Sequence, residues 1–139
     1  MPAAQLRRGL QSALEEDAAV FRTSSTLERG LARLTALRAD MADLALVDRG
    51  LIWNTDLSEA LELDNMVAQA MVTVASALNR TETRGAHARE DFPERDDQNW
   101  LKHSLAWLGQ EGVRLADRPV RLAPLTNEVA SFPPKARLY

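Results

Sequence analysis

Apolar residues at helical spacing over the first eighty residues constrain this chain more than any other feature of its sequence. Between residues 3 and 22 the apolar side chains recur every three or four positions, which is the spacing of one face of an α-helix: Leu6, Leu10, Leu14, Ala18 and Phe21. Charged residues such as Arg7 and Glu15 occupy the other side of this segment. The pattern predicts a first amphipathic helix over residues 3–22.

A second helix is predicted after a short polar break. Ser25 followed three residues later by Glu28 is a capping-box pattern, and it marks the start of a helix of roughly 20 residues. Gly30 lies inside this helix, where glycine weakens helix formation by up to about 1 kcal/mol relative to alanine. We expect the reason to be close packing of another backbone at that position.

A third helix follows the segment 48–55, which interrupts the helical pattern. Asp56 and Glu59 repeat the cap spacing, and apolar residues at helical spacing continue to about residue 79. Asp64 interrupts the apolar face of this helix. We expect its carboxylate to lie at the helix edge and to pair with an arginine, since a buried charge is usually paired.

Three amphipathic helices with short connections predict an antiparallel, spectrin-repeat-like three-helix bundle over residues 1–81. Residues 82–97 are dense in charge and predict a polar loop. Alternating apolar residues on both sides of the turn signal at residues 110–112 predict a β-hairpin, although residues 100–108 also suit a short helix. Prolines predict an extended tail. The expected fold is therefore mainly α, with residues 82–139 forming the loop, hairpin and tail of the same domain.

Length and composition exclude several function classes. A chain of 139 residues fits one domain and is too short for a dinucleotide-binding domain plus a substrate domain. The absence of cysteine excludes disulfides, thiolate metal sites and iron–sulfur ligation within the chain. A net charge of −3 without a basic cluster gives no reason to expect nucleic-acid binding. No apolar run approaches the roughly 20 residues that span a bilayer, so we expect a soluble chain with no membrane span.

The charged loop is the densest candidate for chemistry. His87 could act as a general base oriented by Glu90 or Asp91, or could join these carboxylates and His103 in the metal site of a small metal-dependent enzyme. No recognised metal-ligand spacing occurs in the sequence. The interpretation we favour is a loop ordered by arginine–carboxylate pairs, against its own domain or against a neighbour.

Within this loop, Arg84 and Arg89 are the strongest docking candidates because a guanidinium group forms bidentate pairs. We expect these two arginines to make more side-chain hydrogen bonds than the other loop residues. Gly85 is expected to allow a backbone turn that other residues disfavour. The full set of candidates for loop ordering or interdomain contact is Arg84, Gly85, His87, Arg89, Glu90, Asp91 and Arg95.

The same region carries a family resemblance. Residues 83–108 read TRGAHAREDFPERDDQNWLKHSLAWL, and this run closely resembles the C-terminal region of succinate dehydrogenase flavoprotein subunits. Fumarate reductase flavoproteins share its core, S-R-G-A-H-x-R-E-D-F-P-x-R-D-D, in which Thr83 here replaces Ser and preserves the hydroxyl. The resemblance extends upstream through residues 48–70 and downstream to RPVRLAPLTNEV and PPKARLY. L-Aspartate oxidase and adenylylsulfate reductase are less similar around this segment.

The resemblance implies a three-helix C-terminal domain followed by a short β-containing tail. It implies that the intact subunit carries covalently bound FAD, oxidises succinate to fumarate and passes electrons through an iron–sulfur subunit to membrane quinone. The complex would lie at the cytoplasmic side of the bacterial inner membrane. The family's flavin- and substrate-binding residues lie upstream of this segment, so the resemblance assigns no catalytic, cofactor-binding or metal residue to this chain.

The role expected from the resemblance is structural: packing on the flavin domain of the same subunit and facing the iron–sulfur subunit. The chain alone is therefore not expected to be an enzyme or to bind FAD. Alternatives are a free-standing helical adaptor, or the corresponding domain of a fumarate reductase or an L-aspartate oxidase. A domain of a larger subunit should expose apolar residues where the rest of the subunit packs. Leu51, Ile52, Trp53 and Phe132 are the expected residues, since they lie in otherwise loop-like stretches.

Overall fold

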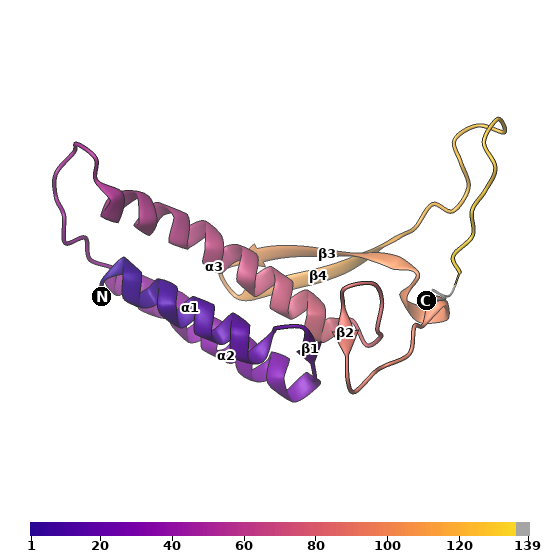
Figure 1. Cartoon of the computed structure of the whole chain (residues 1–139), viewed down its shortest axis with the longest axis horizontal. Helices are drawn as coiled ribbons and strands as arrows, with labels where there is room; N and C mark the ends of the chain where they lie inside the picture. The colour runs from indigo at the N-terminus through magenta and orange to yellow at the C-terminus, as the bar shows by residue number, and fades with distance from the viewer. Residues whose placement is uncertain (136–139) are drawn as a thin grey trace.

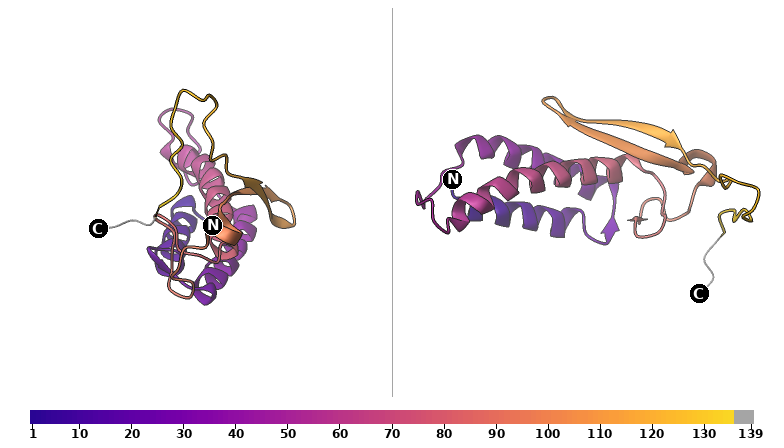
Figure 2. Two further views of the ribbon diagram at one scale, coloured as in Figure 1. Left: turned by 90° about the vertical axis from the view of Figure 1, so that its right-hand side faces the viewer. Right: turned by 90° about the horizontal axis from the view of Figure 1, so that it is seen from above.

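Three long helices and one antiparallel hairpin make up most of the computed structural model, which describes residues 1–135 (Figure 1). Helices α1 (Ala3–Asp17), α2 (Ser24–Asp40) and α3 (Thr55–Asn79) run in alternating directions. Strands β3 (Lys102–Gly109) and β4 (Gly112–Pro119) pair around a tight turn, and the hairpin lies along α3 (Figure 2). The prediction of a mainly α fold with a helical bundle followed by a hairpin is confirmed.

Four short elements complete the fold. A 3-10 turn, η1 (Met41–Asp43), extends α2, and a single helical turn, α4 (Asp97–Trp100), precedes the hairpin. Two strands of two residues each, β1 (Phe21–Arg22) and β2 (Ala88–Arg89), pair in parallel although they are far apart in the sequence. This pairing ties the connection between α1 and α2 to the charged loop.

The core lies between the three long helices and is almost entirely aliphatic. Each helix contributes large apolar side chains that are at most 2% exposed: Leu6, Leu10, Leu27, Leu34, Leu63, Val67 and Val74. Burial of one such side chain contributes about 1.5–3 kcal/mol. The helical spacing of these residues therefore accounts for the bundle.

The first helix ends at Asp17, so the predicted extension to residue 22 is wrong. Ala18 leaves the helical conformation at φ −136°, and the Arg22 Nε–H donates to the Ala18 and Ala19 carbonyls at 3.1 and 2.8 Å. Phe21 pairs with Ala88 in the β1–β2 ladder and exposes its side chain. The apolar spacing continued to Phe21, but backbone pairing with a distant segment determines the conformation there.

The cap of the second helix lies two residues before the predicted position. Thr23, in extended conformation, is the N-cap of α2, and its hydroxyl accepts from the Thr26 backbone N–H at 3.2 Å. The Thr26 hydroxyl accepts from the Thr23 N–H at 3.0 Å and completes the capping box. The Ser25–Glu28 assignment is therefore wrong. A run of four hydroxyl residues, 23–26, offers several equivalent caps, and the local sequence does not choose among them.

The third helix also begins before its predicted cap. The Asn54 side chain accepts from the Leu57 backbone N–H at 2.8 Å, which makes Asn54 the N-cap of α3. Asp56 instead accepts from the backbone N–H groups of the preceding loop. The buried face of α3 runs through Leu63 and Val67, whereas Asp64 is exposed, which agrees with the predicted helix-edge position. The predicted pairing with an arginine is wrong within residues 1–135, where the Asp64 carboxylate forms no ion pair.

Gly30 has the predicted packing role. A Cβ atom added there would lie 2.9 Å from the Asp17 Cβ, so α1 and α2 approach too closely for any larger residue. Asp17 is itself buried, and its carboxylate accepts from Arg29 Nε at 2.7 Å and Arg33 Nη1 at 2.9 Å. These ion pairs stabilise the close contact between the two helices.

The described part of the tail, residues 120–135, is irregular and largely exposed. The Arg95 Nη1 group donates to the Lys135 carbonyl at 2.7 Å, which holds the tail near the charged loop. The last four residues of the PPKARLY segment lie outside the described residues. Leu51, Ile52, Trp53 and Phe132 are all exposed, as predicted. Within residues 1–135, no helix combines the length and apolar character needed to cross a bilayer.

Candidate functional site

The charged loop, residues 82–97, closes the end of the bundle where α3 ends and α2 begins (Figure 1). We call this end, with residues 80–97, the motif end. Arg84 and His87 exchange two backbone hydrogen bonds, at 2.9 and 3.1 Å, around a turn in which Gly85 adopts φ 60°. A β-carbon is disfavoured in this left-handed conformation, which explains the glycine. The Thr83 hydroxyl accepts from the Arg89 N–H at 2.9 Å and donates to the Phe92 carbonyl at 2.9 Å, so a hydroxyl is required at position 83.

Arg89 lies at the centre of the motif end and is 1% exposed. Its Nη1 group donates to three backbone carbonyls at the end of α3, at 2.9 Å to Ala77, 3.1 Å to Leu78 and 3.2 Å to Arg80. The last carbonyls of a helix lack partners within the helix and carry its partial negative charge. The guanidinium group therefore serves as the C-terminal cap of α3.

The other side of the same guanidinium group binds Asp91. Arg89 Nε and Nη2 donate to the two Asp91 carboxylate oxygens at 2.8 and 2.9 Å. Asp91 Oδ2 also accepts from the backbone N–H and the hydroxyl of Ser24, both at 2.7 Å, in the first turn of α2. Hydrogen bonds from Arg89 and then from Ser24 hold the pKa of Asp91 well below its usual range. The Arg89–Asp91 bridge thus joins the negative end of α3 to the positive end of α2.

A second buried charge, Glu82, organises the loop above this bridge. Its carboxylate accepts from Arg84 Nε and Nη2 at 2.8 and 3.0 Å, from the Asp96 backbone N–H at 2.9 Å, and from Arg80. Burial alone would raise the pKa of Glu82, but the hydrogen bonds from Arg84, Asp96 and Arg80 outweigh burial and lower it. Arg84 also pairs with Asp97 at 2.7 Å. Its pKa rises above its ordinary value, mainly because it donates to Glu82.

Arg80 connects this network to the hairpin. Its Nη1 group donates to the Trp100 carbonyl at 3.0 Å, and its guanidinium carbon lies 5.2 Å from the centre of the Trp100 ring. Neither Arg80 nor Glu82 was singled out from the sequence. The alternation Arg80-Thr81-Glu82-Thr83-Arg84 is the signal that could have identified them, because an extended chain places alternate residues on one face.

His87 is half-buried and uses both ring nitrogens. Nδ1 lies 3.2 Å from Arg22 Nη1, and Nε2 lies 3.1 Å from the Arg80 carbonyl oxygen. A guanidinium group only donates, so Nδ1 accepts and the proton sits on Nε2. Burial lowers the pKa of His87, and the charges of Arg22, Arg89 and Arg80 lower it further. The ring is therefore held neutral between arginines.

The catalytic and metal interpretations of the loop do not match this geometry. Glu90 is exposed and Asp91 is bound to Arg89, so neither carboxylate orients His87. Among residues 1–135, no three histidine or carboxylate side chains gather as metal ligands, so the cluster expected around His87 and His103 does not form. Arg89 makes the most side-chain hydrogen bonds in the loop, as expected. Arg84 does not exceed Glu82 or Asp91 in this respect, and that part of the prediction is wrong.

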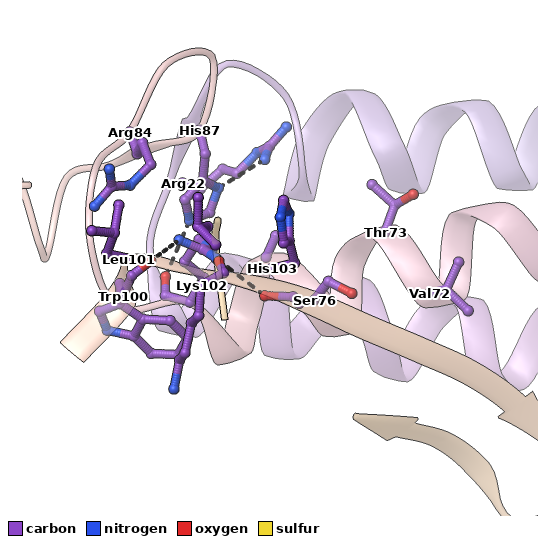
Figure 3. A pocket seen from close by; sticks show the side chains of 14 residues that line it. Arg22, Val72, Thr73, Ser76, Arg84, His87, Trp100, Leu101, Lys102 and His103 are labelled. Atoms are coloured by element: carbon purple, nitrogen blue, oxygen red, sulfur yellow. Dashed lines mark hydrogen bonds between the residues drawn. The ribbon is translucent and has the colours of Figure 1, made fainter. Parts of the chain in front are cut away.

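A cleft of about 670 Å³ lies between α3, β3 and the charged loop (Figure 3). Its lining contains four cationic side chains and two histidines but no carboxylate: Arg22, Arg80, Arg84, Lys102, His87 and His103. Lys102 pairs with Asp117 at 2.7 Å outside the lining, and Arg95 at the loop edge pairs with Asp97 at 2.8 Å. Three of the four cations already have carboxylate partners outside the lining, because Glu82 pairs with Arg80 and Arg84, and Asp117 pairs with Lys102. No pattern in the sequence placed Arg22 there, because it reaches the loop only through the β1–β2 pairing.

Comparison with protein families matches residues 7–139 to the family described as fumarate reductase flavoprotein C-term. The chain is 50% identical over 139 residues to the mitochondrial succinate dehydrogenase [ubiquinone] flavoprotein subunit of Oryza sativa, covering 100% of this chain and 22% of that subunit. It is 47% identical over 137 residues to the succinate dehydrogenase flavoprotein subunit of Rickettsia conorii, covering 98% of this chain and 23% of that subunit. The chain therefore spans less than a quarter of the length of these relatives.

Solved structures show the same fold. A structure of E. coli quinol fumarate reductase superposes with a TM-score of 0.85 at 32% identity, covering 91% of this chain and 22% of that chain. Adenylylsulfate reductase of Archaeoglobus fulgidus superposes with a TM-score of 0.78 at 28% identity, covering 87% of this chain and 20% of that chain.

Proposed function

The chain belongs to the family of C-terminal domains of fumarate reductase and succinate dehydrogenase flavoproteins, and from this membership we propose that it packs on the flavin domain of a succinate-oxidising flavoprotein subunit as a structural domain. The observation that carries the proposal is that the charged side chains of the loop bind other groups of this same chain. Arg89, Asp91 and Glu82 join helix ends and loop segments of this chain to each other. Side chains held in this way stabilise a domain, and the flavin and the substrate then belong to the preceding part of the polypeptide.

Succinate oxidation is favoured over fumarate reduction by the degree of similarity. Identity reaches 50% and 47% with two succinate dehydrogenase subunits, whereas it is 35% over 136 residues with the fumarate reductase flavoprotein subunit of Mycobacterium tuberculosis. In the proposed subunit, FAD accepts electrons from succinate and an iron–sulfur subunit takes them onward to quinone. We place this complex at the cytoplasmic side of the inner membrane, as the resemblance implies.

The test compares the flavoprotein polypeptide with and without this chain. Without it, we expect loss of bound FAD and of succinate-dependent reduction of an artificial electron acceptor, and partial recovery when the chain is supplied separately. The chain by itself should be colourless after desalting and should show no turnover above the buffer control. A polypeptide that lacks the chain yet holds FAD and oxidises succinate like the intact subunit would contradict the structural role and favour a free-standing adaptor. Turnover by the chain alone that His87→Ala abolishes would instead show that the charged loop is catalytic.

A further inference from the structure

The end of the bundle opposite the motif end carries a short apolar loop. We call residues 48–54, between η1 and α3, the tip. Three consecutive side chains of the tip are almost fully exposed: Leu51 at 92%, Ile52 at 82% and Trp53 at 93%. Single exposed apolar residues are normal on protein surfaces, but a contiguous exposed group marks a contact site.

The backbone of the tip is held in place by polar side chains. Asn54 Nδ2 donates to the Asp48 and Gly50 carbonyls at 3.0 and 2.7 Å, and Asp48 Oδ1 accepts from the Gly50 N–H at 2.8 Å. Asp56 Oδ2 accepts from the Val47 and Asp48 N–H groups at 2.6 and 3.2 Å. The polar side chains therefore point inward to the loop backbone while the apolar ones point outward. A loop organised in this way loses little conformational entropy on binding.

Trp53 adds a second and independent observation. Its φ is 57°, and it is the one non-glycine residue with positive φ among residues 1–135. Bulky residues avoid this left-handed region, which glycine and asparagine adopt readily. The chain thus places a tryptophan, almost fully exposed, in a backbone conformation that favours a small residue. Such a strained position points to a function of the indole itself.

The N-terminus of the chain lies beside the tip. The Met1 ammonium group donates to the Asp43 carbonyl, and the Ala45 N–H donates to the Met1 carbonyl at 2.9 Å, just before the tip begins. Figure 1 shows the N-terminus and the loop before α3 at the same end of the bundle. The matching family is a C-terminal one, and this chain covers 22% of the rice subunit. Under the proposed function, the remaining polypeptide is joined to this domain at residue 1, beside the tip.

We propose that Leu51, Ile52 and Trp53 insert into an apolar depression on the polypeptide that precedes residue 1, next to the junction. The inference rests on the proposed function and deepens it by assigning the contact surface. A short covalent connection gives the two surfaces a high effective concentration, so a small apolar contact suffices. The depression should also offer a hydrogen-bond acceptor for the indole N–H of Trp53, as a buried tryptophan normally requires.

The experiment uses the intact flavoprotein subunit and the triple variant Leu51→Ser, Ile52→Ser, Trp53→Ser. The rate of limited proteolysis at the junction before residue 1 should rise at least tenfold in this variant. The matched control is Val20→Ser, Phe21→Ser, which removes two side chains that are 65% and 71% exposed at the motif end. This control should leave the proteolysis rate unchanged. Urea denaturation of the 139-residue chain carrying the triple change should match wild type, which separates docking from folding.

Four outcomes decide the matter. A tenfold faster cleavage confined to the triple variant supports the inference. A triple variant that is cleaved like wild type, while deletion of the whole chain still causes loss of FAD, overturns this inference and leaves the proposed function standing. Deletion without loss of FAD or activity overturns the proposed function itself. Normal cleavage with loss of iron–sulfur subunit binding, or of self-association, assigns the tip to a different partner and overturns the inference.

A spectroscopic measurement provides a second test. Acrylamide should quench the Trp53 emission, obtained by difference from Trp53→Phe, efficiently in the 139-residue chain. In the intact subunit the same emission should be at least fivefold less accessible to the quencher. Equal quenching in both would show that Trp53 stays in solvent and would overturn the proposal.

Discussion

At the motif end of the bundle the buried side chains are charged and bind each other, whereas at the tip the exposed side chains are apolar and face solvent. Arg89 and Glu82 are buried with partners from their own chain, while Leu51, Ile52 and Trp53 bury little against it. The sequence predicted both features: arginine–carboxylate pairing in the charged loop and exposed apolar side chains at Leu51, Ile52 and Trp53. Ionic groups with internal partners thus stabilise the fold, whereas apolar groups without internal partners remain available for binding.

The largest expected effect comes from removing the centre of the motif end. Arg89→Met keeps much of the side-chain length but leaves Asp91 and three carbonyls without their donor, which should cost about 3–5 kcal/mol of unfolding free energy. Urea denaturation followed by helix content measures this. Arg95→Met removes an exposed pair with Asp97 and should cost no more than about 1 kcal/mol. If Arg89→Met and Arg95→Met were equally stable, the hydrogen bonds of Arg89 would contribute no more to the free energy of unfolding than an exposed ion pair does.

Acid should weaken the motif end next. Hydrogen bonds from Arg89 and Ser24 lower the pKa of Asp91, and those from Arg84, Asp96 and Arg80 lower that of Glu82 in spite of burial. A carboxyl group with a lowered folded-state pKa stabilises the fold above its unfolded pKa, about 3.9 for Asp and about 4.3 for Glu. That stability is lost as the pH falls through the folded-state value. The free energy of unfolding should therefore drop below about pH 4.

The matched control for the acid prediction is the double variant Asp91→Asn, Glu82→Gln. It should be less stable than wild type at neutral pH and should lose less of its remaining stability between neutral and acid pH. Parallel pH profiles for the two proteins would mean that other carboxylates determine the acid response.

A smaller effect is expected from two glycines that face different neighbours. Gly30→Ala places a Cβ 2.9 Å from the Asp17 Cβ, an atom fixed to the backbone, and should cost about 1–2 kcal/mol after the gain in helix propensity. Gly9→Ala meets only the flexible end of Leu37, at 3.1 Å, and should be nearly neutral. Thermal denaturation of both variants provides the comparison. Equal loss at both positions would show that close helix packing is not specific to the Asp17–Gly30 contact.

The smallest effect, with the opposite sign, is expected at the tip. Trp53→Gly relieves the positive φ and removes a side chain that is 93% exposed, so the isolated chain should be unchanged or more stable by up to about 1 kcal/mol. The greater flexibility of glycine in the unfolded chain keeps the gain small. Denaturant titration of the isolated chain tests this, with Trp107→Gly in β3 as a destabilising control. Clear destabilisation by Trp53→Gly would mean that the indole supports the fold itself.

The bundle could be predicted because its determinants are local. Leu6 and Leu10, like Leu27 and Leu34, recur at the helical period and all are buried. The helix ends could not be placed in the same way. Phe21 continues the helical spacing, yet its backbone pairs with Ala88, which no nearby residue indicates.

The candidate site could likewise be predicted only where its determinants are local in the sequence. The charge pattern of residues 82–97 correctly suggested ordering by arginines, because both signs alternate over a segment with few apolar residues. The groups that these arginines bind could not be predicted. Arg89 binds the carbonyls that end α3 and the Ser24 hydroxyl, and Ser24 reaches it only after α2 has packed against α3.

The long sequence separation within the motif end has a consequence for synthesis. Ser24 lies 65 residues before Arg89 and 67 residues before Asp91. At about 5–20 residues per second, a ribosome needs roughly 3–13 s to add the segment between them. During that interval α2 lacks its Asp91 cap and α3 is incomplete, so the nascent domain exposes apolar helix faces. Chaperones and proteases therefore have several seconds to act before the final residues of the charged loop close the domain.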